Sequence, residues 1–498
     1  MESTSAAPSS AAPPPVPSPV PLCVDLDGTL VLTDTIQEAA LLAVKRRPGI
    51  LFQAPFWLLH GREVFKNRLT ERAVPDAALL PYREELLDWL KEQAALRPLY
   101  LVTGSDQRVA DAVAANVAPL FSAAWGSNAT RNLSGSGKAR FLVERFGAKG
   151  FDYAGNASVD LKVWKEARQA VVAGAPASLV AEVRKRFEGA VVFPSARPSL
   201  ASLARSIRVQ QWAKNILVFT VLFAAHQLFD IGLWLKALTA FMALSLMASA
   251  IYVINDLLDL EADRKHPQKR KRPFASGRVP AAWGVAMIAP LLAGAAVLAA
   301  QLPPAAQLIV GIYPVISVAY SFYLKRQRLV DVFTLSLLST IRVLLGAAAT
   351  GILCSQWLMG FCSFFFLSLA FSKRASELIN LQQRHGTSAT GRAYFVWDLA
   401  AIQAAGIASG FTAGIVLTLY MQSREVHQLY ARPEWLWVIA IGTVYWLVRV
   451  WLIASRGALD EDPVLFAIRD RSSYLLCGLF GCAVILAKFG WFGVPGIQ

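Results

Sequence analysis

Cysteine is scarce in this chain. Its 498 residues include five cysteines, no two of which form a CxxC pair, and four of which stand in long apolar runs. This distribution predicts neither a disulfide framework nor a zinc site. The beginning of the chain, rich in proline, serine and alanine, also lacks the basic and apolar regions of a signal peptide, so residues 1–20 are expected to form a disordered tail.

Charged residues are few as well, at 17% of the chain against 55% hydrophobic residues. Nearly all long apolar runs lie after Gln210, whereas the first two hundred residues have the composition of a soluble α/β protein. We therefore expect a soluble domain over residues 21–195, an interfacial linker over residues 196–212 and a membrane domain over residues 213–498.

Acidic residues are fewer than basic residues. The 34 Asp and Glu residues face 49 Lys and Arg residues, which gives a net charge of +15. The excess lies mostly in loops beside apolar runs, so it favours anionic lipid headgroups and phosphorylated substrates as partners and predicts no nucleic-acid partner.

The soluble half carries two carboxylates at the end of a short apolar strand. Asp25 and Asp27, in the motif DLDGT, follow the run PLCV. Alternate side chains of a strand share a face, so both can point into the crevice at the carboxyl end of a parallel sheet. Two further predicted strands end at Thr103 and at Asn156, and Lys138 opens a helix between them. An ordinary Asp-Gly turn would explain the first motif alone but not the ordered series.

These motifs resemble those of the haloacid-dehalogenase superfamily of phosphotransferases, over roughly residues 21–190. The resemblance implies a Rossmann-like α/β fold with a mostly helical cap between about residues 30 and 98, and phosphatase activity. It implies that Asp25 is the nucleophile that forms an aspartyl-phosphate and that Asp27 is the acid/base.

The same resemblance implies roles for the later motifs. Thr103 and Lys138 would hold the phosphoryl oxygens, and Asp25, Asn156 and Asp160 would bind Mg²⁺. Asn156 stands where the superfamily generally has an aspartate, which removes one negative charge beside the metal.

The second half contains roughly nine apolar runs of about 18–22 residues, the length of a transmembrane helix. They predict an all-α polytopic membrane bundle of about nine transmembrane helices, the first of them centred near Val221. Loops rich in Lys and Arg alternate with loops of little charge, so the positive-inside rule predicts a protein of the cytoplasmic (inner) membrane whose N-terminal domain is cytoplasmic.

An acidic stretch follows the apolar run that ends at Ile254. It reads NDLLDLEAD and continues as RKHPQKRKRP. On one continuous helix Asn255, Asp259 and Asp263 recur every four residues and share a face, with Asp256 beside them. Carboxylates at a membrane surface suit Mg²⁺, and the following cations suit phosphate. A basic run alone is an ordinary topology signal, but the two together predict a diphosphate site.

This half resembles the UbiA superfamily of intramembrane prenyltransferases, whose first Asp-rich signature NDLLDLEAD matches. The stretches RVQQWAKN and YLKRQRLVD resemble, more narrowly, the polyprenyl-phosphate (decaprenyl-phosphate) phosphoribosyltransferase branch. The resemblance implies that Asp256, Asp259 and Asp263 hold Mg²⁺ on the diphosphate of the donor. The residues expected to bind substrate are Lys214, Asn255, Arg264, Lys269, Arg270, Arg272, Tyr323, Lys325 and Arg342.

Three functions remain open at this point. The first is transfer of 5-phosphoribose from 5-phosphoribosyl diphosphate to a polyprenyl phosphate, with the fused phosphatase domain removing the 5-phosphate of the product. The second is transfer of a prenyl group from a prenyl diphosphate to an aromatic acceptor. The third is a non-enzymatic lipid-binding bundle, against which the intact acidic motifs argue. The oligomeric state stays open, a homo-oligomer included.

Overall fold

The computed structural model describes residues 19–128, 131–195, 198–383, 393–459 and 463–489. Residues 1–18 of the expected tail lie outside this range. The chain divides into two compact units: unit 1 is Met1–Ser206 with Asp256–Gly284, and unit 2 is Ile207–Asn255 with Val285–Gln498. The acidic and basic stretch therefore belongs by its contacts to unit 1.

Unit 1 contains a six-stranded parallel sheet in the order β3-β2-β1-β4-β5-β6. Its strands are β1 (Leu22–Val24), β2 (Leu99–Asp106), β3 (Ala123–Ser127), β4 (Asp152–Gly155), β5 (Ala170–Ala173) and β6 (Val191–Phe193). Short runs that are buried throughout, such as LCV in β1, are typical of parallel strands covered on both faces. Because β1 pairs with both β2 and β4, the carboxyl ends of these three strands lie side by side.

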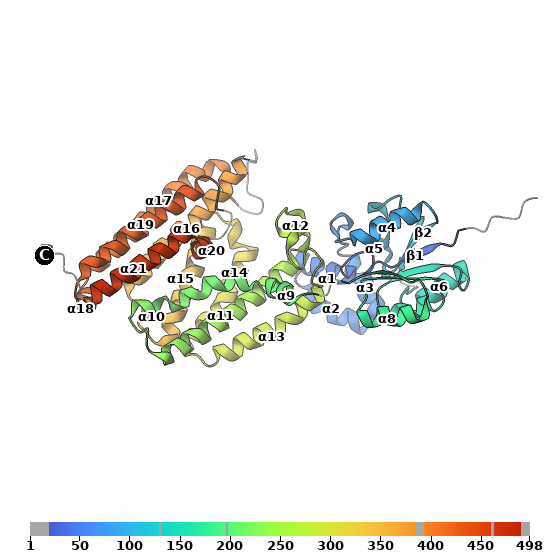
Figure 1. Cartoon of the computed structure of the whole chain (residues 1–498), viewed down its shortest axis with the longest axis horizontal. Helices are drawn as coiled ribbons and strands as arrows, with labels where there is room; N and C mark the ends of the chain where they lie inside the picture. Colours follow the sequence, from blue (N-terminus) through green and yellow to red (C-terminus); the bar gives the residue numbers. More distant parts are fainter. Residues whose placement is uncertain (1–18, 129–130, 196–197, 384–392, 460–462, 490–498) are drawn as a thin grey trace, which may run out of the picture. The chain divides into compact units, whose positions relative to one another are not determined.

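Helices cover both faces of this sheet, and Figure 1 shows α4 and α5 on one side and α8 on the other. Right-handed crossovers that wind outward from β1 in two directions produce this arrangement. The helices that cover the sheet are α4 (Glu84–Ala94), α5 (Gln107–Asn116), α6 (Ser136–Phe146), α7 (Leu161–Trp164) and α8 (Ala177–Arg186). A further helix of this unit, α9 (Leu200–Ser206), follows β6.

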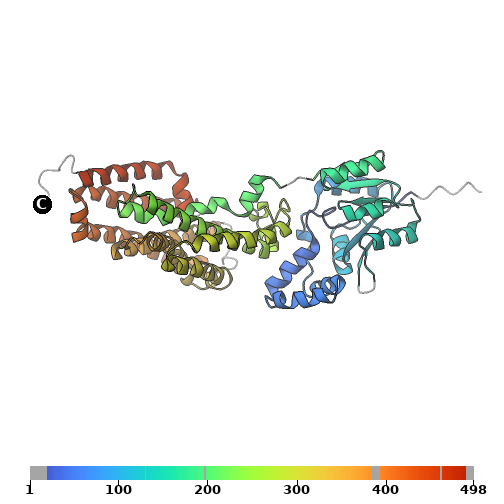
Figure 2. The same ribbon diagram turned by 90° about the horizontal axis from the view of Figure 1, so that it is seen from below.

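Three further helices stand between β1 and α4 and form the predicted helical cap. They are α1 (Thr35–Arg46), α2 (Ile50–Leu59) and α3 (Arg62–Thr70), drawn in blue as a projection from the α/β part in Figure 2. The Asp34 side chain caps α1 by accepting from the backbone N–H groups of Ile36 and Gln37.

The acidic stretch is not one continuous helix. Helix α11 (Ile231–Leu258) ends before Asp259, and α12 (Leu260–Lys265) begins after it, followed by a short 3-10 helix, η4 (Lys269–Lys271). Asp259 lies between the two helices with φ −100° and ψ 14°. The predicted sharing of one helical face by Asn255, Asp259 and Asp263 is therefore wrong, because the backbone turns at Asp259.

Unit 2 is a bundle of long helices. Besides most of α11 it contains α10 (Thr220–Ala224), α13 (Ala281–Ala299, from Val285 on), α14 (Pro304–Phe322), α15 (Val330–Thr350), α16 (Gln356–Gln383), α17 (Leu399–Met421), α18 (Arg424–Leu429), α19 (Trp437–Ala454), α20 (Pro463–Arg469) and α21 (Arg471–Phe489). Within the described ranges, 8 helices are long and apolar enough to cross a membrane. The protein is accordingly an integral membrane protein.

The expected count of about nine differs from these 8 at the segment around Val221. There the chain forms a 3-10 helix, η3 (Val209–Phe219), followed by the short α10. Polar residues interrupt the apolar run before Ile216, and one of them, Asn215, is buried and donates to Ser245 Oγ at 3.0 Å. An inward-facing amide with a fixed partner shortens the apolar run that a regular spanning helix requires.

Helix α15 packs closely against η3 at a glycine. A Cβ atom added at Gly346 would lie 2.0 Å from the carbonyl oxygen of Val218. Since a backbone carbonyl cannot swing aside as a flexible side chain does, this contact requires glycine.

We expect Gly346→Ala to lower the melting temperature of the detergent-solubilised protein, because overpacking costs about 1–3 kcal/mol. Gly311→Ala is the matched control: Gly311 also lies within a long helix, α14, but a Cβ there meets nothing within 4 Å. Equal melting temperatures for the two variants would contradict the close approach of η3 to α15.

Candidate functional site

A buried polar network lies at the carboxyl end of β1 in unit 1. Lys138 Nζ donates to Asp25 Oδ1 at 2.7 Å and to Tyr153 OH at 2.8 Å. Tyr153 OH donates in turn to Asp160 Oδ1 at 3.0 Å, and Asp160 Oδ2 accepts from the backbone N–H of Asn156 at 3.0 Å. The structure thus links Asp25, Lys138 and Asp160 through a tyrosine that the sequence analysis did not single out.

The second carboxylate of the motif DLDGT, Asp27, accepts four hydrogen bonds. Its Oδ1 accepts from both the backbone N–H and the hydroxyl of Thr35, each at 2.7 Å. Its Oδ2 accepts from Ser105 Oγ at 2.7 Å and from Thr103 Oγ1 at 3.2 Å. Because Thr35 is the first residue of α1, the helical cap begins at this carboxylate.

The electrostatics of the network favour the protonated forms of Asp25 and Tyr153. Burial raises the pKa of Asp25 to about 7, with Lys138 opposing the rise and Asp160 adding to it. Burial also raises the pKa of Tyr153 well above its ordinary value, so its hydroxyl stays a hydrogen-bond donor at neutral pH. Asp25 therefore has its pKa in the range in which a carboxylate can exchange protons during a reaction.

Gly28, in the DLDGT motif, holds the turn and the side chain of Asn156 together. Gly28 has φ +73°, and a Cβ atom there would lie 2.0 Å from Asn156 Nδ2. Only glycine satisfies both the left-handed backbone and this approach. The Asn156 side chain consequently lies against the turn that carries Asp25 and Asp27.

The cap also reaches this end of the sheet. Lys66 of α3 donates from Nζ to the carbonyl oxygen of Gly104 at 2.9 Å, next to Thr103. Sequence reasoning missed Lys66 because nothing in the pattern of α3 separates it from a solvated lysine. Ser105 had a signal, since it stands in the motif VTGS.

The acidic stretch forms a second polar cluster within unit 1. Arg272 Nη1 donates to Asp256 Oδ1 at 3.1 Å and to Asp263 Oδ2 at 2.6 Å, and both carboxylates are buried. Burial raises the pKa of Asp263, and Arg272 opposes that rise. Asp259 is not part of this cluster, because it accepts from Lys45 Nζ of α1 at 2.7 Å.

Arg264 makes a two-pronged ion pair with a residue of the cap. Its Nη1 and Nη2 donate to the two carboxylate oxygens of Glu38 at 2.7 and 2.6 Å, and the side chains are only 6% and 4% exposed. Its Nε donates to the carbonyl oxygen of Ala275 at 2.9 Å. Lys269 and Arg270, which were also expected to bind phosphate, lie exposed in η4.

Unit 2 encloses a polar cavity of about 200 Å³. Of the residues expected to bind substrate, Lys214, Asn255 and Arg342 line it. Arg342 is buried, and it donates from Nε to Asn215 Oδ1 at 2.9 Å, from Nη2 to Tyr313 OH at 3.0 Å, and from Nη1 to the carbonyl of Leu338. These three acceptors, an amide oxygen, a hydroxyl and a backbone carbonyl, are all neutral groups.

A larger apolar cavity of about 1020 Å³ adjoins the polar one. Both cavities are lined in part by Leu217, Phe366 and Leu369. The bundle therefore has a polar cavity with cationic side chains beside an apolar cavity that could bind a hydrocarbon chain.

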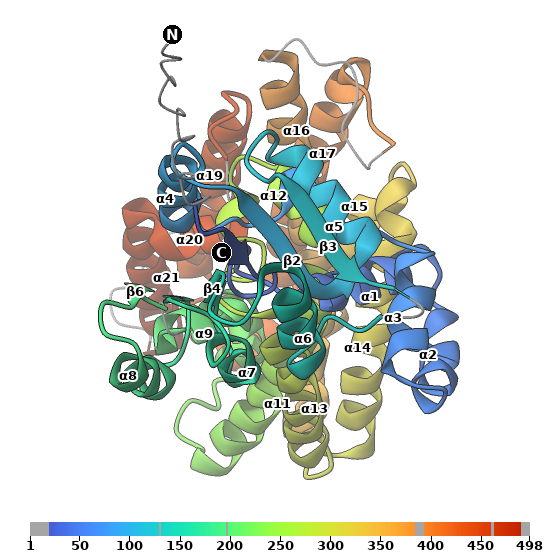
Figure 3. The same ribbon diagram turned by 90° about the vertical axis from the view of Figure 1, so that its right-hand side faces the viewer.

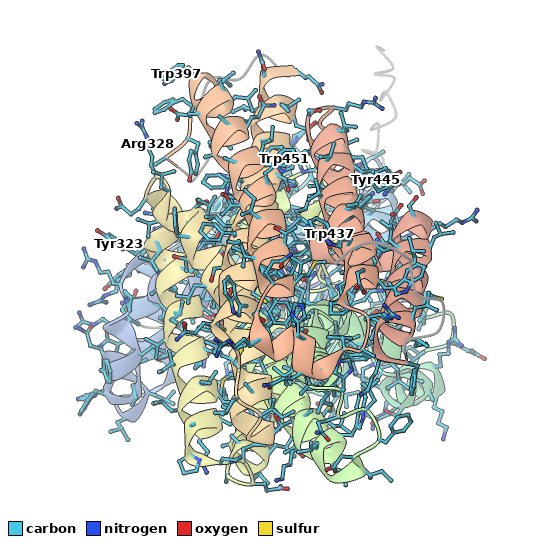
Figure 4. All side chains as sticks on the ribbon, turned by 90° about the vertical axis from the view of Figure 1, so that its left-hand side faces the viewer. Tyr323, Arg328, Trp397, Trp437, Tyr445 and Trp451 are labelled. Carbon is cyan, nitrogen blue, oxygen red and sulfur yellow. The ribbon has the colours of Figure 1, made fainter. Side chains whose placement is uncertain are left out.

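Tyr323 and Lys325 are not among the residues that line the polar cavity. Figure 4 labels Tyr323 at the outer edge of the bundle, and its side chain is exposed. Nearby, Arg374 Nε donates to Asp331 Oδ2 at 2.6 Å, and Tyr394 OH donates to Asp331 Oδ1 at 2.6 Å. The Asp331 carboxylate is thus neutralised within the bundle itself.

The donor sets of both clusters fit Mg²⁺. No group of three or more His, Cys, Asp or Glu side chains in the described part of the chain is placed to hold a metal ion. Mg²⁺, however, typically takes one or two protein carboxylates and completes its shell with waters and substrate phosphates. Asp256 and Asp263 supply two buried carboxylates in one place, as Asp25 and Asp160 do on either side of Lys138 and Tyr153.

Comparison with known proteins gives the following matches. The model of the UbiA prenyltransferase family matches residues 216–472. A Sinorhizobium fredii protein, named only as uncharacterized protein y4nM, is 34% identical over 94% of this chain and 91% of its own length. The decaprenyl-phosphate phosphoribosyltransferase of Mycobacterium tuberculosis is 35% identical over 56% of this chain and 91% of its own length. A haloacid dehalogenase-like hydrolase of Streptococcus pneumoniae is 17% identical, with a TM-score of 0.26, over 36% of this chain and 95% of that one.

We expect Glu38→Gln to loosen α12, because it leaves Arg264 buried without a counter-charge, a loss worth about 3–5 kcal/mol. Hydrogen exchange of the peptide that spans Leu260–Lys265 should rise. In the matched control Glu182→Gln, the lost ion pair with Arg186 is exposed and is worth at most about 1 kcal/mol. Unchanged exchange in α12 would refute a stabilising role for the buried pair.

Proposed function

Because the chain belongs to the UbiA prenyltransferase family, we propose that it is a transferase that moves 5-phosphoribose from 5-phosphoribosyl diphosphate to a polyprenyl phosphate. The N-terminal domain then removes the 5-phosphate of the lipid-linked product. The similarity to decaprenyl-phosphate phosphoribosyltransferase over most of that enzyme's length supports the first step.

The observation that carries the proposal is the charge of the polar cavity. Arg342 is buried, and its acceptors in the described bundle are an amide oxygen, a hydroxyl and a carbonyl. A buried guanidinium without a carboxylate favours an anionic ligand strongly, and phosphate matches its fork of donors. Lys214 lines the same cavity and adds a second cation.

The adjoining apolar cavity fits the lipid part of the acceptor. At about 1020 Å³ it exceeds what one aromatic ring needs, and it shares lining residues with the polar cavity, so a hydrocarbon chain bound there would lie beside the cations. A polyprenyl phosphate has this form, with a phosphate at one end of a long hydrocarbon chain.

In the transfer, a phosphate oxygen of the lipid forms a bond to the anomeric carbon of ribose, and the bond from that carbon to the diphosphate breaks. Asp256 and Asp263 would hold Mg²⁺, which when bound supplies positive charge to the leaving diphosphate. Asp256 directly follows the cavity residue Asn255 along α11. Arg342 and Lys214 would bind and orient the phosphate of the acceptor.

The second step uses the network at the end of β1. Asp25 would attack the 5-phosphate, and Lys138 and Thr103 would bind its oxygens. Asp27, already fixed by Thr35 and Ser105, would donate a proton to the leaving ribose oxygen and later take one from water. Asp25, Asn156 and Asp160 would hold Mg²⁺ there. The positive-inside rule supports an inner-membrane protein with a cytoplasmic N-terminal domain as part of this proposal.

We expect Asp256→Asn and Arg342→Met each to lower the transfer of ribose label to lipid by about a hundredfold, the usual cost of losing one charge-stabilising group. The assay incubates the purified chain with 5-phosphoribosyl diphosphate labelled in the ribose carbons, polyprenyl phosphate and Mg²⁺, and counts the organic phase. Lys236→Gln, an exposed lysine of α11, is the control and should keep wild-type activity.

The competing candidate is prenyl transfer to an aromatic acceptor, and the same preparation decides between the two. No ribose label in lipid, together with a prenylated aromatic product from a prenyl diphosphate, would overturn the phosphoribosyl assignment.

We expect Asp25→Asn to leave lipid labelling intact while abolishing release of inorganic phosphate, so that the lipid product keeps its 5-phosphate. The reason is that the amide cannot act as the nucleophile. Chromatography of the extracted lipid measures the phosphorylated product directly. Unchanged phosphate release would rule out the aspartyl-phosphate route without affecting the transferase assignment.

A further inference from the structure

The cap helix α2 exposes an unusual apolar surface. Its sequence, ILFQAPFWLL, contains a single polar side chain, Gln53. Only Ile50 is buried, and the exposed apolar residues are Leu51 (59%), Phe52 (80%), Phe56 (65%), Leu58 (53%) and Leu59 (83%). Single exposed apolar residues are normal, but a contiguous set of large ones marks a surface that binds protein or membrane.

The helix is nevertheless firmly attached to the cap. Ile50 packs in a cluster with Ala43, Leu69 and Ala73. Trp57 packs against the same cluster, and the Arg72 guanidinium lies 4.4 Å from the centre of its ring. Figure 3 shows α2 at the outer edge of unit 1, beside α3. The apolar residues are therefore presented outward by a fixed scaffold.

The length of α2 fits a position in the membrane interface. Its 10 residues rise about 15 Å, half of the hydrocarbon thickness that a spanning helix must cross. A short apolar helix of this kind lies at the boundary of headgroups and acyl chains, with its apolar side chains in the lipid.

The charges beside α2 suit anionic headgroups. Arg46 and Arg47 are exposed immediately before the helix, and Arg68 is exposed after it. Two exposed acids, Glu63 and Glu71, stand in and directly after α3, so the excess is carried mainly by the arginines that precede α2. If α2 bound α2 of a second copy of the chain, the arginines of the two copies would repel each other. Lipid phosphates attract them instead.

From these observations we infer that α2 is a membrane-docking helix, which inserts its apolar side chains into the surface of a bilayer with anionic headgroups. The domain is covalently joined to a membrane-spanning bundle, so a bilayer is always present at high effective concentration. Docking would hold the phosphatase site close to the surface at which a lipid-linked phosphomonoester is displayed, a consequence that rests on the proposed function.

The test labels the helix from the lipid side and needs no substrate, so it is independent of the proposed activities. The full chain is placed in nanodiscs of phosphatidylcholine and phosphatidylglycerol that contain a phospholipid with a photoreactive acyl chain. After irradiation, lipid adducts are mapped by mass spectrometry, with α13 as the internal standard for a spanning helix. We expect adducts on the peptide that contains α2, and a loss of about fivefold or more in the double variant Phe52→Ser, Leu59→Ser.

Matched variants distinguish docking from general stickiness. Leu96→Ser removes another strongly exposed apolar residue (69%) elsewhere in unit 1 and should leave the α2 adducts unchanged. The double variant Arg46→Gln, Arg47→Gln should reduce them with phosphatidylglycerol present and have little effect in phosphatidylcholine alone. Circular dichroism and melting temperature confirm that each variant is folded.

Two outcomes would overturn the inference. One is an absence of acyl adducts on α2 while α13 is labelled normally. The other is cross-linking of α2 to α2 between two copies of the chain in place of lipid adducts, which would assign the surface to a dimer.

Discussion

Arg342 carries a positive charge inside a bundle of apolar helices, with neutral acceptors around it in the described residues. Burying a charge without a counter-charge is costly, and proteins keep such groups where a ligand supplies the missing charge. The same bundle shows the alternative, because Arg374 is equally buried and is neutralised by Asp331. The contrast between these two arginines separates a structural ion pair from a binding group.

The buried polar network of unit 1 also contains a cation, but there the cation is paired with a carboxylate. Lys138 is buried against Asp25, and Tyr153 connects that pair to Asp160. Burial raises the pKa of Asp25 to about 7, because Lys138 does not fully offset the desolvation of this carboxyl and the repulsion from Asp160. A bound cation would relieve that imbalance, which is why the acids fit a Mg²⁺ site.

Much of this could be predicted from the sequence because the signals are local. Short apolar runs that end at Asp25, Thr103 and Asn156 identify three adjacent strands, and the edge at which they meet follows from the parallel sheet. In the same way, all but one of the predicted apolar runs of the second half correspond to long helices. The exception lies around Val221, where the buried amide of Asn215 makes a tertiary contact that hydropathy does not detect.

The remaining differences arise from contacts between residues far apart in the chain. Lys45 and Asp259 are 214 positions apart, and Glu38 and Arg264 are 226 apart. Helical periodicity describes only neighbouring residues, so it could not predict these pairs or the break in the helix at Asp259. Helical spacing grouped Asn255, Asp259 and Asp263, whereas Arg272 groups Asp256 with Asp263. The sequence likewise does not identify Tyr153 and Tyr313 as site residues, because a buried aromatic in a strand or membrane helix is usually part of the core.

The central claim is that one chain joins ribose to a lipid phosphate and then removes the 5-phosphate. The most direct measurement gives the wild-type protein 5-phosphoribosyl diphosphate that carries one isotope in the ribose carbons and another in the 5-phosphate, together with polyprenyl phosphate and Mg²⁺. The account predicts that the ribose isotope moves into the lipid while the 5-phosphate isotope appears as inorganic phosphate in the water phase. Lipid that carries neither isotope would contradict the transfer, and lipid that keeps both in their starting ratio would contradict the dephosphorylation.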